Sequence, residues 1–380
     1  MIWLLFGLTM LVVLLPMLPA IAEWHWPSDV APLHIDTQDA LDPPFLARSF
    51  AARLGAAVSV RQAELGPTPI AHAPAEGRWP LRASEGRAAQ SRRIWHAAGD
   101  ADLPAGISFM GEVVANGDLR SAPRGVYRAL WSGQRLHLAE MGTVLHWAHG
   151  AQVDVQPGCQ LGGRVSADES IVLRGELAFA LLHAPSVRFA LPEGAAAGAT
   201  WTGPSIFPSG LLAPVVWDSV GHRGTCSEPL AISARRAWSG DLVCAADLWL
   251  GAGCHARGSL KARGDIAADE GCRVSGSVFA EGLIRLGAHC TVIGSVVSET
   301  EIVLGAGCLI GAPGCPATVA APRITVAPGT VVHGTLWAGE RGRVVEDRAA
   351  SGPSQSPRDA AQRPVASPGL TGRPARGVAA

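Results

Sequence analysis

Apolar residues recur every six positions through the C-terminal half of the chain. An α-helix with about 3.6 residues per turn cannot keep such a row on one face. A triangular β-solenoid can, because three six-residue segments make one coil of about 18 residues and alternate side chains of each short strand point inward. The row therefore predicts an all-β fold, a triangular β-helix with about 18 residues per coil. This six-residue ladder comprises Leu242, Leu248, Cys254, Leu260, Ile266, Cys272, Val278, Ile284, Cys290, Val296, Ile302 and Cys308.

Small residues follow each ladder position by four residues, and only Glu270 breaks this rule. A narrow coil interior has room for one branched or thiol side chain per strand, so the neighbouring corner is expected to be Gly, Ala or Thr. The clearest corners are Gly258, Gly276 and Gly294, which recur once per coil of about 18 residues.

The same spacing predicts further blocks with different regularity. Residues 107–190 form a less regular solenoid block, residues 191–237 an insert, and residues 238–345 the regular β-helix. Within the last block the count slips by four residues after Cys308, which indicates a corner insertion before the ladder resumes at Ile324, Thr330 and Leu336. The ladder of the irregular block comprises Met141, Trp147, Val153, Cys159, Val165, Ile171 and Leu177.

Both termini differ from the solenoid in composition. Residues 1–22 contain no charged side chain and are long enough to cross a bilayer, so they are either a membrane segment or a signal peptide. Because no Lys or Arg precedes the apolar run and the run is longer than a usual signal core, we expect a retained single-pass transmembrane helix. In residues 23–106 we expect a juxtamembrane helix and a linker; Asp42 caps the helix, and Leu46, Phe50 and Leu54 share one face. Residues 346–380 are rich in Pro, Ser, Ala, Gly and Arg and are expected to be a disordered tail.

Charge and cysteine usage limit the possible partners. The formal net charge is −1, which gives no electrostatic basis for binding nucleic acid. Four of the eight cysteines stack on the ladder as small buried hydrophobes, and this favours a reducing compartment and a cytoplasmic body. Cys226, Cys244 and Cys315 lie off the ladder, and their pairing is not set by the spacing.

The segment from Gly276 to Gly311 resembles the bactofilins, the polymer-forming cytoskeletal family of bacteria. Its repeat starts with Gly, then Ser or Asp, then an aliphatic residue, as in Gly240-Asp241-Leu242 and Gly258-Ser259-Leu260. The resemblance covers residues 238–344 well and 107–190 loosely. It implies a β-helix that polymerises end to end without a nucleotide, attaches to the membrane and serves as a scaffold for envelope or shape-determining proteins. We therefore expect a non-catalytic scaffold at the bacterial inner membrane, with no cofactor.

Two other functions share the six-residue period. A hexapeptide-repeat acyltransferase-like enzyme needs a histidine base or zinc-binding histidines. Here His255, His289 and His333 fall in different registers, and His146 and His149 show no third ligand nearby, so we expect no catalytic, cofactor or metal site. The second alternative is a monomeric solenoid binding module whose insert at 191–237 recognises a partner.

Overall fold

The computed structural model describes residues 2–17, 42–73, 89–191, 215–218 and 222–345. Contacts divide the chain into two units, Met1–Phe45 and Leu46–Ala380. The first contains the helix α1 (Ile2–Leu14), followed by a single 3₁₀ turn, η1 (Leu15–Met17). Within the residues described, no helix is both long and apolar enough to span a membrane. The expected transmembrane helix over 1–22 includes residues 18–22, which lie outside the described residues, as does the expected tail 346–380.

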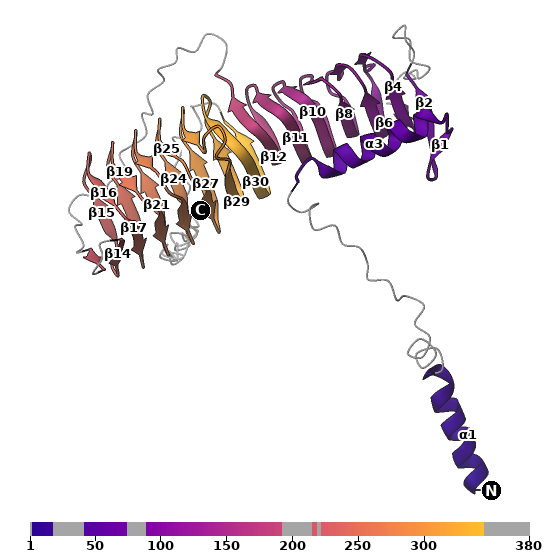
Figure 1. Cartoon of the computed structure of the whole chain (residues 1–380), viewed down its shortest axis with the longest axis horizontal. Coiled ribbons are helices and arrows are strands. Elements are labelled where there is room, and N and C mark those ends of the chain that lie inside the picture. Colours follow the sequence, from indigo (N-terminus) through magenta and orange to yellow (C-terminus); the bar gives the residue numbers. More distant parts are fainter. Residues whose placement is uncertain (1, 18–41, 74–88, 192–214, 219–221, 346–380) are drawn as a thin grey trace, which may run out of the picture. The chain divides into compact units, whose positions relative to one another are not determined.

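The expected amphipathic helix is present as α3 (Phe45–Ser59). Its first turn is closed by a hydrogen bond from Phe45 N to the carbonyl of Asp42, at 3.0 Å. Leu54 on this helix is fully buried and forms a cluster with Ile94 and Val114 of the solenoid. Figure 1 shows α3 lying along the strands of the first block.

The main body is an all-β solenoid of about 13 turns, with about 18 residues per turn. Its first block begins before residue 107, because strands within the expected linker already pair in parallel with β6 and β7. The strands of this first block are β1 (Glu64–Leu65), β2 (Thr68–His72), β3 (Ala89–Ser91), β4 (Ile94–Ala97), β5 (Ala101–Asp102), β6 (Ile107–Ala115), β7 (Leu119–Arg120), β8 (Val126–Ser132), β9 (Arg135–Leu138), β10 (Thr143–Val155), β11 (Gln160–Leu173) and β12 (Leu177–Phe189).

The parallel coils of the second block also begin earlier than expected, at Arg223, within the range expected to be an insert. Its first coil pairs in register with the next, as in Cys226 opposite Cys244. The strands of this second block are β13 (Val216–Trp217), β14 (Arg223–Cys226), β15 (Leu230–Ile232), β16 (Ala237–Ser239), β17 (Asp241–Cys244), β18 (Leu248–Leu250), β19 (His255–Arg257), β20 (Leu260–Ala262), β21 (Ile266–Ala268), β22 (Arg273–Val274), β23 (Val278–Ala280), β24 (Ile284–Leu286), β25 (Thr291–Val292), β26 (Val296–Ser298), β27 (Glu301–Leu304), β28 (Leu309–Ile310), β29 (Ala317–Val326) and β30 (Val331–Val344).

The two blocks differ in coil length. In the second block Leu242 lies opposite Leu260, and Leu260 opposite Val278, which is the register of the regular coil. In the first block Val126 lies opposite Thr143, a step that is shorter by one residue. A strict six-residue count therefore falls out of step with the inward-facing positions in part of the first block. Two residues of its expected ladder are not in the core: Met141 is exposed and Trp147 is only half-buried.

The corner insertion after Cys308 is also present. Leu309 lies opposite Val331, so this coil is four residues longer than the regular one, and the extra chain forms a small turn in which Ala312 bridges Cys315. Ile324, Thr330 and Leu336 are again buried, as the resumed ladder predicts.

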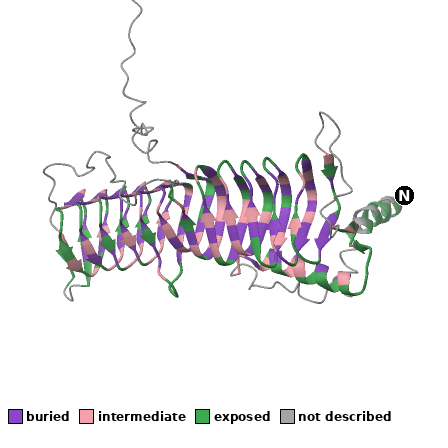
Figure 2. Ribbon diagram, turned by 90° about the horizontal axis from the view of Figure 1, so that it is seen from above, coloured by how far each residue is buried: buried purple, intermediate pink, exposed green. Residues whose placement is uncertain are grey.

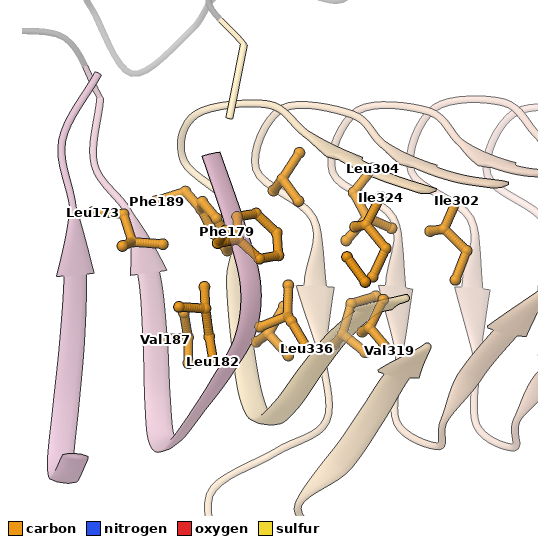
Figure 3. Packing of buried hydrophobic residues seen from close by; sticks show 14 of the residues in the cluster. Leu173, Phe179, Leu182, Val187, Phe189, Ile302, Leu304, Val319, Ile324 and Leu336 are labelled. Carbon is orange, nitrogen blue, oxygen red and sulfur yellow. The ribbon is translucent and has the colours of Figure 1, made fainter. Parts of the chain in front are cut away.

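The two blocks meet through their C-terminal coils. β12 pairs antiparallel with β30, for example Leu182 with Leu336, whereas the stacked coils on either side pair in parallel. Buried side chains continue across this junction without a break, as Figure 3 shows for Phe179, Phe189, Leu182 and Leu336. The last coil of each block is therefore covered by the other.

Candidate functional site

All twelve residues of the six-residue ladder are buried in one continuous core. Figure 2 shows this burial as a purple band that runs through both blocks. The corner glycines are small for a different reason from the one expected. A Cβ at Gly258 would overlap the carbonyl oxygen of Gly240, and one at Gly276 would come within 2.6 Å of the backbone of Gly258. Close stacking of neighbouring coils, not a narrow interior, excludes side chains there. Glu270, the exception in the sequence, is exposed.

The ladder cysteines are free thiols with a repeated hydrogen bond. Each thiol donates to a carbonyl of the preceding coil: Cys254 to Ser233, Cys272 to Gly251, Cys290 to Asp269 and Cys308 to Gly287, at 3.1–3.3 Å. Among the residues described, no group of three or more His, Cys, Asp or Glu side chains is arranged to hold a metal ion. The thiols therefore serve as core side chains and weak donors.

Stacking and burial also raise the pKa of three ladder thiols, those of Cys254, Cys272 and Cys290. The hydrogen bond with Cys272, and then burial, raise the pKa of Cys254. The contact with Cys254 lowers the pKa of Cys272, but the contact with Cys290 and burial outweigh it, and the net pKa is about 12. Because the thiolate is the nucleophile and the metal ligand, the raised pKa of these three thiols disfavours both kinds of reaction.

The histidines do not form one cluster in the described structure. His255 lies in register with Ala237 and Arg273, neither of which is a histidine, and His289 occupies a corner with a positive φ of 57°. His333 belongs to the junction, where its Nδ1 lies 2.9 Å from the carbonyl oxygen of Pro185.

His149 has the most developed surroundings of any histidine in the first block. Its ring is fully buried, stacks on Trp131 at 4.4 Å, and places Nδ1 2.9 Å from Ser166 Oγ and Nε2 3.5 Å from Asp168 Oδ2. Asp168 also pairs with Arg48 of α3. Ser166 is buried as well, whereas the Asp168 side chain is 43% exposed. The group contacts α3 through the Arg48–Asp168 ion pair.

The N-terminal coil of the second block is a candidate association surface. In the part of the chain that the structure describes, β15 pairs only with β18 and β16 only with β19. β14 alone has a second neighbour, the two-residue β13. Leu230 and Ala231 of β15 are buried, whereas Ala237 and Ser239 of β16 are exposed, so the edge of β16 offers backbone N–H and C=O groups to another strand.

A hollow of about 460 Å³ adjoins this open end. Its lining includes Trp217, Leu230, Trp238 and Leu242. The Trp238 indole nitrogen is buried and has no hydrogen-bond acceptor among the described residues. Buried polar groups in proteins almost always have a partner, so this N–H marks the end as a surface that another chain could complete.

The N-terminal coil of the first block is arranged similarly. β2 covers β4, whereas within the described ranges β3 pairs only with β6 and β5 only with β7. His72 lies in register with His96, and their rings meet edge to face at 5.9 Å. Burial, and then the neighbouring His72, lower the pKa of His96. Among the residues that the structure describes, exposed backbone edges therefore remain at β16 in the second block and at β3 and β5 in the first.

The sequence pattern points to the solenoid ends but not to which ends are free. The period gives no signal for the β12–β30 junction. In the sequence, the N-terminal end of the second block is marked by two tryptophans: Trp217 precedes its first coil, and Trp238 lies in the last strand of that coil.

Comparisons with known proteins give no further identification. No protein-family model, no curated protein and no solved structure matches this chain.

Proposed function

We propose that this chain is a structural scaffold that self-associates through the N-terminal coils of its two solenoid blocks, in line with the bactofilin resemblance of its repeat. The observation that carries the proposal is the β12–β30 junction. It covers both C-terminal coils inside one molecule, and within the described residues the two N-terminal coils are the ends left to meet another copy.

The open edges supply the driving force for such an association. An exposed parallel edge is a template for a further strand, and natural proteins normally block it with charge, proline or a covering element. β16, whose Ala237 and Ser239 are exposed, reads Ala-Trp-Ser and contains no charge or proline. Apolar surface adds to the edge, since burial contributes about 25 cal/mol per Å², and Trp217, which lines the adjoining hollow, is 38% exposed.

Two open ends per molecule make the chain bivalent. Bivalent association generates linear assemblies, whereas one free end would stop at a dimer. The proposal therefore includes filament growth.

We further propose that residues 1–22 attach this scaffold to the bacterial inner membrane, with the body on the cytoplasmic side. The support is the uncharged, apolar composition of this segment, and the buried reduced thiols of the body. Envelope proteins would then be held along the solenoid.

The test blocks one edge without touching the core. In β16 the carbonyl of Arg236 accepts from His255 N, so by alternation the N–H of Ala237 faces the open side. Ala237 is exposed, and Ala237→Pro removes only that outward donor. Full-length protein in mild detergent is expected to form filaments by electron microscopy and large species by light scattering, and Ala237→Pro is expected to shorten them.

The matched control is Ala237→Thr, which adds a β-branched side chain at the same place and keeps the N–H. It is expected to assemble like the parent. A parent chain that stays monomeric at all concentrations would exclude the scaffold mechanism.

A further inference from the structure

An apolar row runs along the outside of the solenoid and crosses the junction between the blocks. We call it the outer stripe; its members are Leu181, Trp337, Ala320, Val297 and Phe279. They are consecutive partners in the strand register: Leu181 with Trp337, Trp337 with Ala320, Ala320 with Val297, and Val297 with Phe279. Trp337 is 58% exposed and Phe279 39% exposed.

The outer stripe continues the face on which α3 lies. Beyond Leu181 the register passes to Arg164 and then to Trp147, and Phe50 of α3 contacts the Trp147 ring at 5.8 Å. The chain thus places a helix on one part of this face and leaves the adjoining part open to solvent (Figure 1). We infer that the outer stripe is a docking surface for an amphipathic, basic α-helix of a partner protein.

The geometry favours a helix over a strand. The strands beneath the stripe are paired on both sides: β23 with β20 and β26, and β26 with β23 and β29. They cannot accept another strand, so a partner must bind through side chains. Coils are spaced about 4.8 Å apart and a helix rises about 5.4 Å per turn, so a helix lying along the solenoid meets about one side chain per coil. From Leu181 to Phe279 the four register steps span about 19 Å, the length of a helix of about 13 residues.

The charge beside the stripe sets the character of the partner. A groove of about 400 Å³ is lined by Phe279 and Val297 together with the exposed carboxylates Glu281 and Glu299. Lys261, the register partner of Phe279, closes its far end. Arginine or lysine on one flank of a docked helix would face the two carboxylates, and acidic side chains would be repelled.

The opposite flank of the stripe is neutral. There Ser277 Oγ accepts from Ser295 N and Ser295 Oγ accepts from Thr318 N, both at 3.1 Å. These hydroxyls already serve the coil stacking. The carboxylates also disfavour an anionic lipid surface as the occupant, because like charges repel.

α3 itself provides a probe of the required chemistry. It carries an apolar row with Phe50 and Leu54, and arginines at 48 and 53. A fluorescein-labelled peptide of residues 42–61, titrated with the full chain and followed by anisotropy, is expected to bind saturably. Phe279→Asp and Val297→Asp are each expected to weaken binding by about tenfold, the loss typical of a central contact residue.

Leu309→Asp is the matched control, because Leu309 is 36% exposed on a different face of the same block. This variant is expected to bind the peptide like the parent. All three variants are expected to melt like the parent when unfolding is followed by circular dichroism. A peptide with Arg48 and Arg53 changed to Glu should also bind about tenfold more weakly.

Three results would overturn the inference. The first is no saturable binding of the peptide, and the second is equal weakening of binding by Phe279→Asp and Leu309→Asp. The third is unchanged binding to Phe279→Asp, which would mean that the peptide only replaces α3 at its own position. Phe279-dependent sedimentation with phosphatidylglycerol vesicles, without peptide binding, would assign the stripe to lipid and also overturn it. The inference does not depend on self-association, since the stripe lies on a flank and the proposed assembly uses the ends.

Discussion

Gly342 in β30 lies against the ring of Phe179 in β12, and the two residues are partners in the antiparallel ladder that joins the blocks. A Cβ at position 342 would overlap the ring. The ring of Phe179 is buried between the blocks, beside Phe189 at 6.3 Å. The junction therefore has no room for a side chain at position 342.

Gly342→Val is therefore expected to open or strain the junction. Overpacking typically costs about 1–3 kcal/mol, and here the neighbour is a buried ring with little room to move. The measurement is chemical unfolding of the full chain. Gly339→Val is the control, because its Cβ would meet nothing closer than 3.7 Å, and it should unfold like the parent. Equal destabilisation by the two variants would show that the junction is not tightly packed.

The period of the sequence predicts the coils but not this junction. The six-residue ladder is a local pattern, and each coil needs only its neighbour to bury it, so burial of Leu242 to Cys308 follows from spacing alone. β12 and β30 are joined by pairs such as His183 with Thr335, which are distant in sequence. Nothing in a periodic pattern says which two coil ends meet.

A local period also could not predict where α3 packs or which residues of the first block point inward. The apolar face of α3 predicts a helix that packs, but its partners Ile94 and Val114 point outward from strands, where the period expects polar residues. In the first block the shorter coils drift against a count of six, and this moves Met141 and Trp147 out of the core.

One cysteine should react with a thiol reagent much faster than all the others. Cys315 is exposed and the other cysteines are buried. A chromogenic thiol reagent is expected to modify one thiol per native chain rapidly, and every thiol in guanidinium chloride. Cys315→Ser should abolish the rapid phase. Rapid reaction of a ladder cysteine would contradict the closed core.

The double replacement of Cys272 and Cys290 by Val should leave a folded chain. Each thiol makes one weak bond to a carbonyl, and Val is similar in size, so we expect a combined loss below about 3 kcal/mol. Far-ultraviolet circular dichroism and the unfolding midpoint provide the measurement. Unfolding of this variant would assign the thiols a role beyond packing.

Leu54 should anchor α3 far more strongly than the Arg48–Asp168 ion pair. Leu54 is fully buried, and Leu54→Ala is expected to cost about 2–5 kcal/mol and to speed hydrogen exchange in β4 and β6. Both partners of the ion pair are nearly half exposed, so Arg48→Gln should cost at most about 1 kcal/mol. The reverse order would mean that the polar group around His149 holds the helix.

The N-terminal coil of the first block should weaken in acid. The pKa of His96 is lowered in the folded chain below its usual 6.5, chiefly by burial. The unfolded segment therefore binds more protons between these two pKa values, and the contribution of His96 to stability is full above about pH 6.5 and falls as the pH drops below it. Hydrogen exchange of β4, compared between neutral and mildly acidic buffer, is expected to show this loss.

Replacement of His96 by Gln should flatten that pH dependence, and the exposed His146→Gln should not change it. If β4 responds to pH identically in the parent and in His96→Gln, another group is responsible.

The antiparallel pairing of β12 with β30 also fixes an order of events during synthesis. β12 leaves the ribosome long before its partner β30, the last strand of the second block, is complete, so the first block can form while its last coil still has an open edge. The final strand to be made is the one that covers it. Until then the nascent chain exposes an edge that the finished protein does not, and misassembly at that stage would involve a different surface from the one used by the mature molecule.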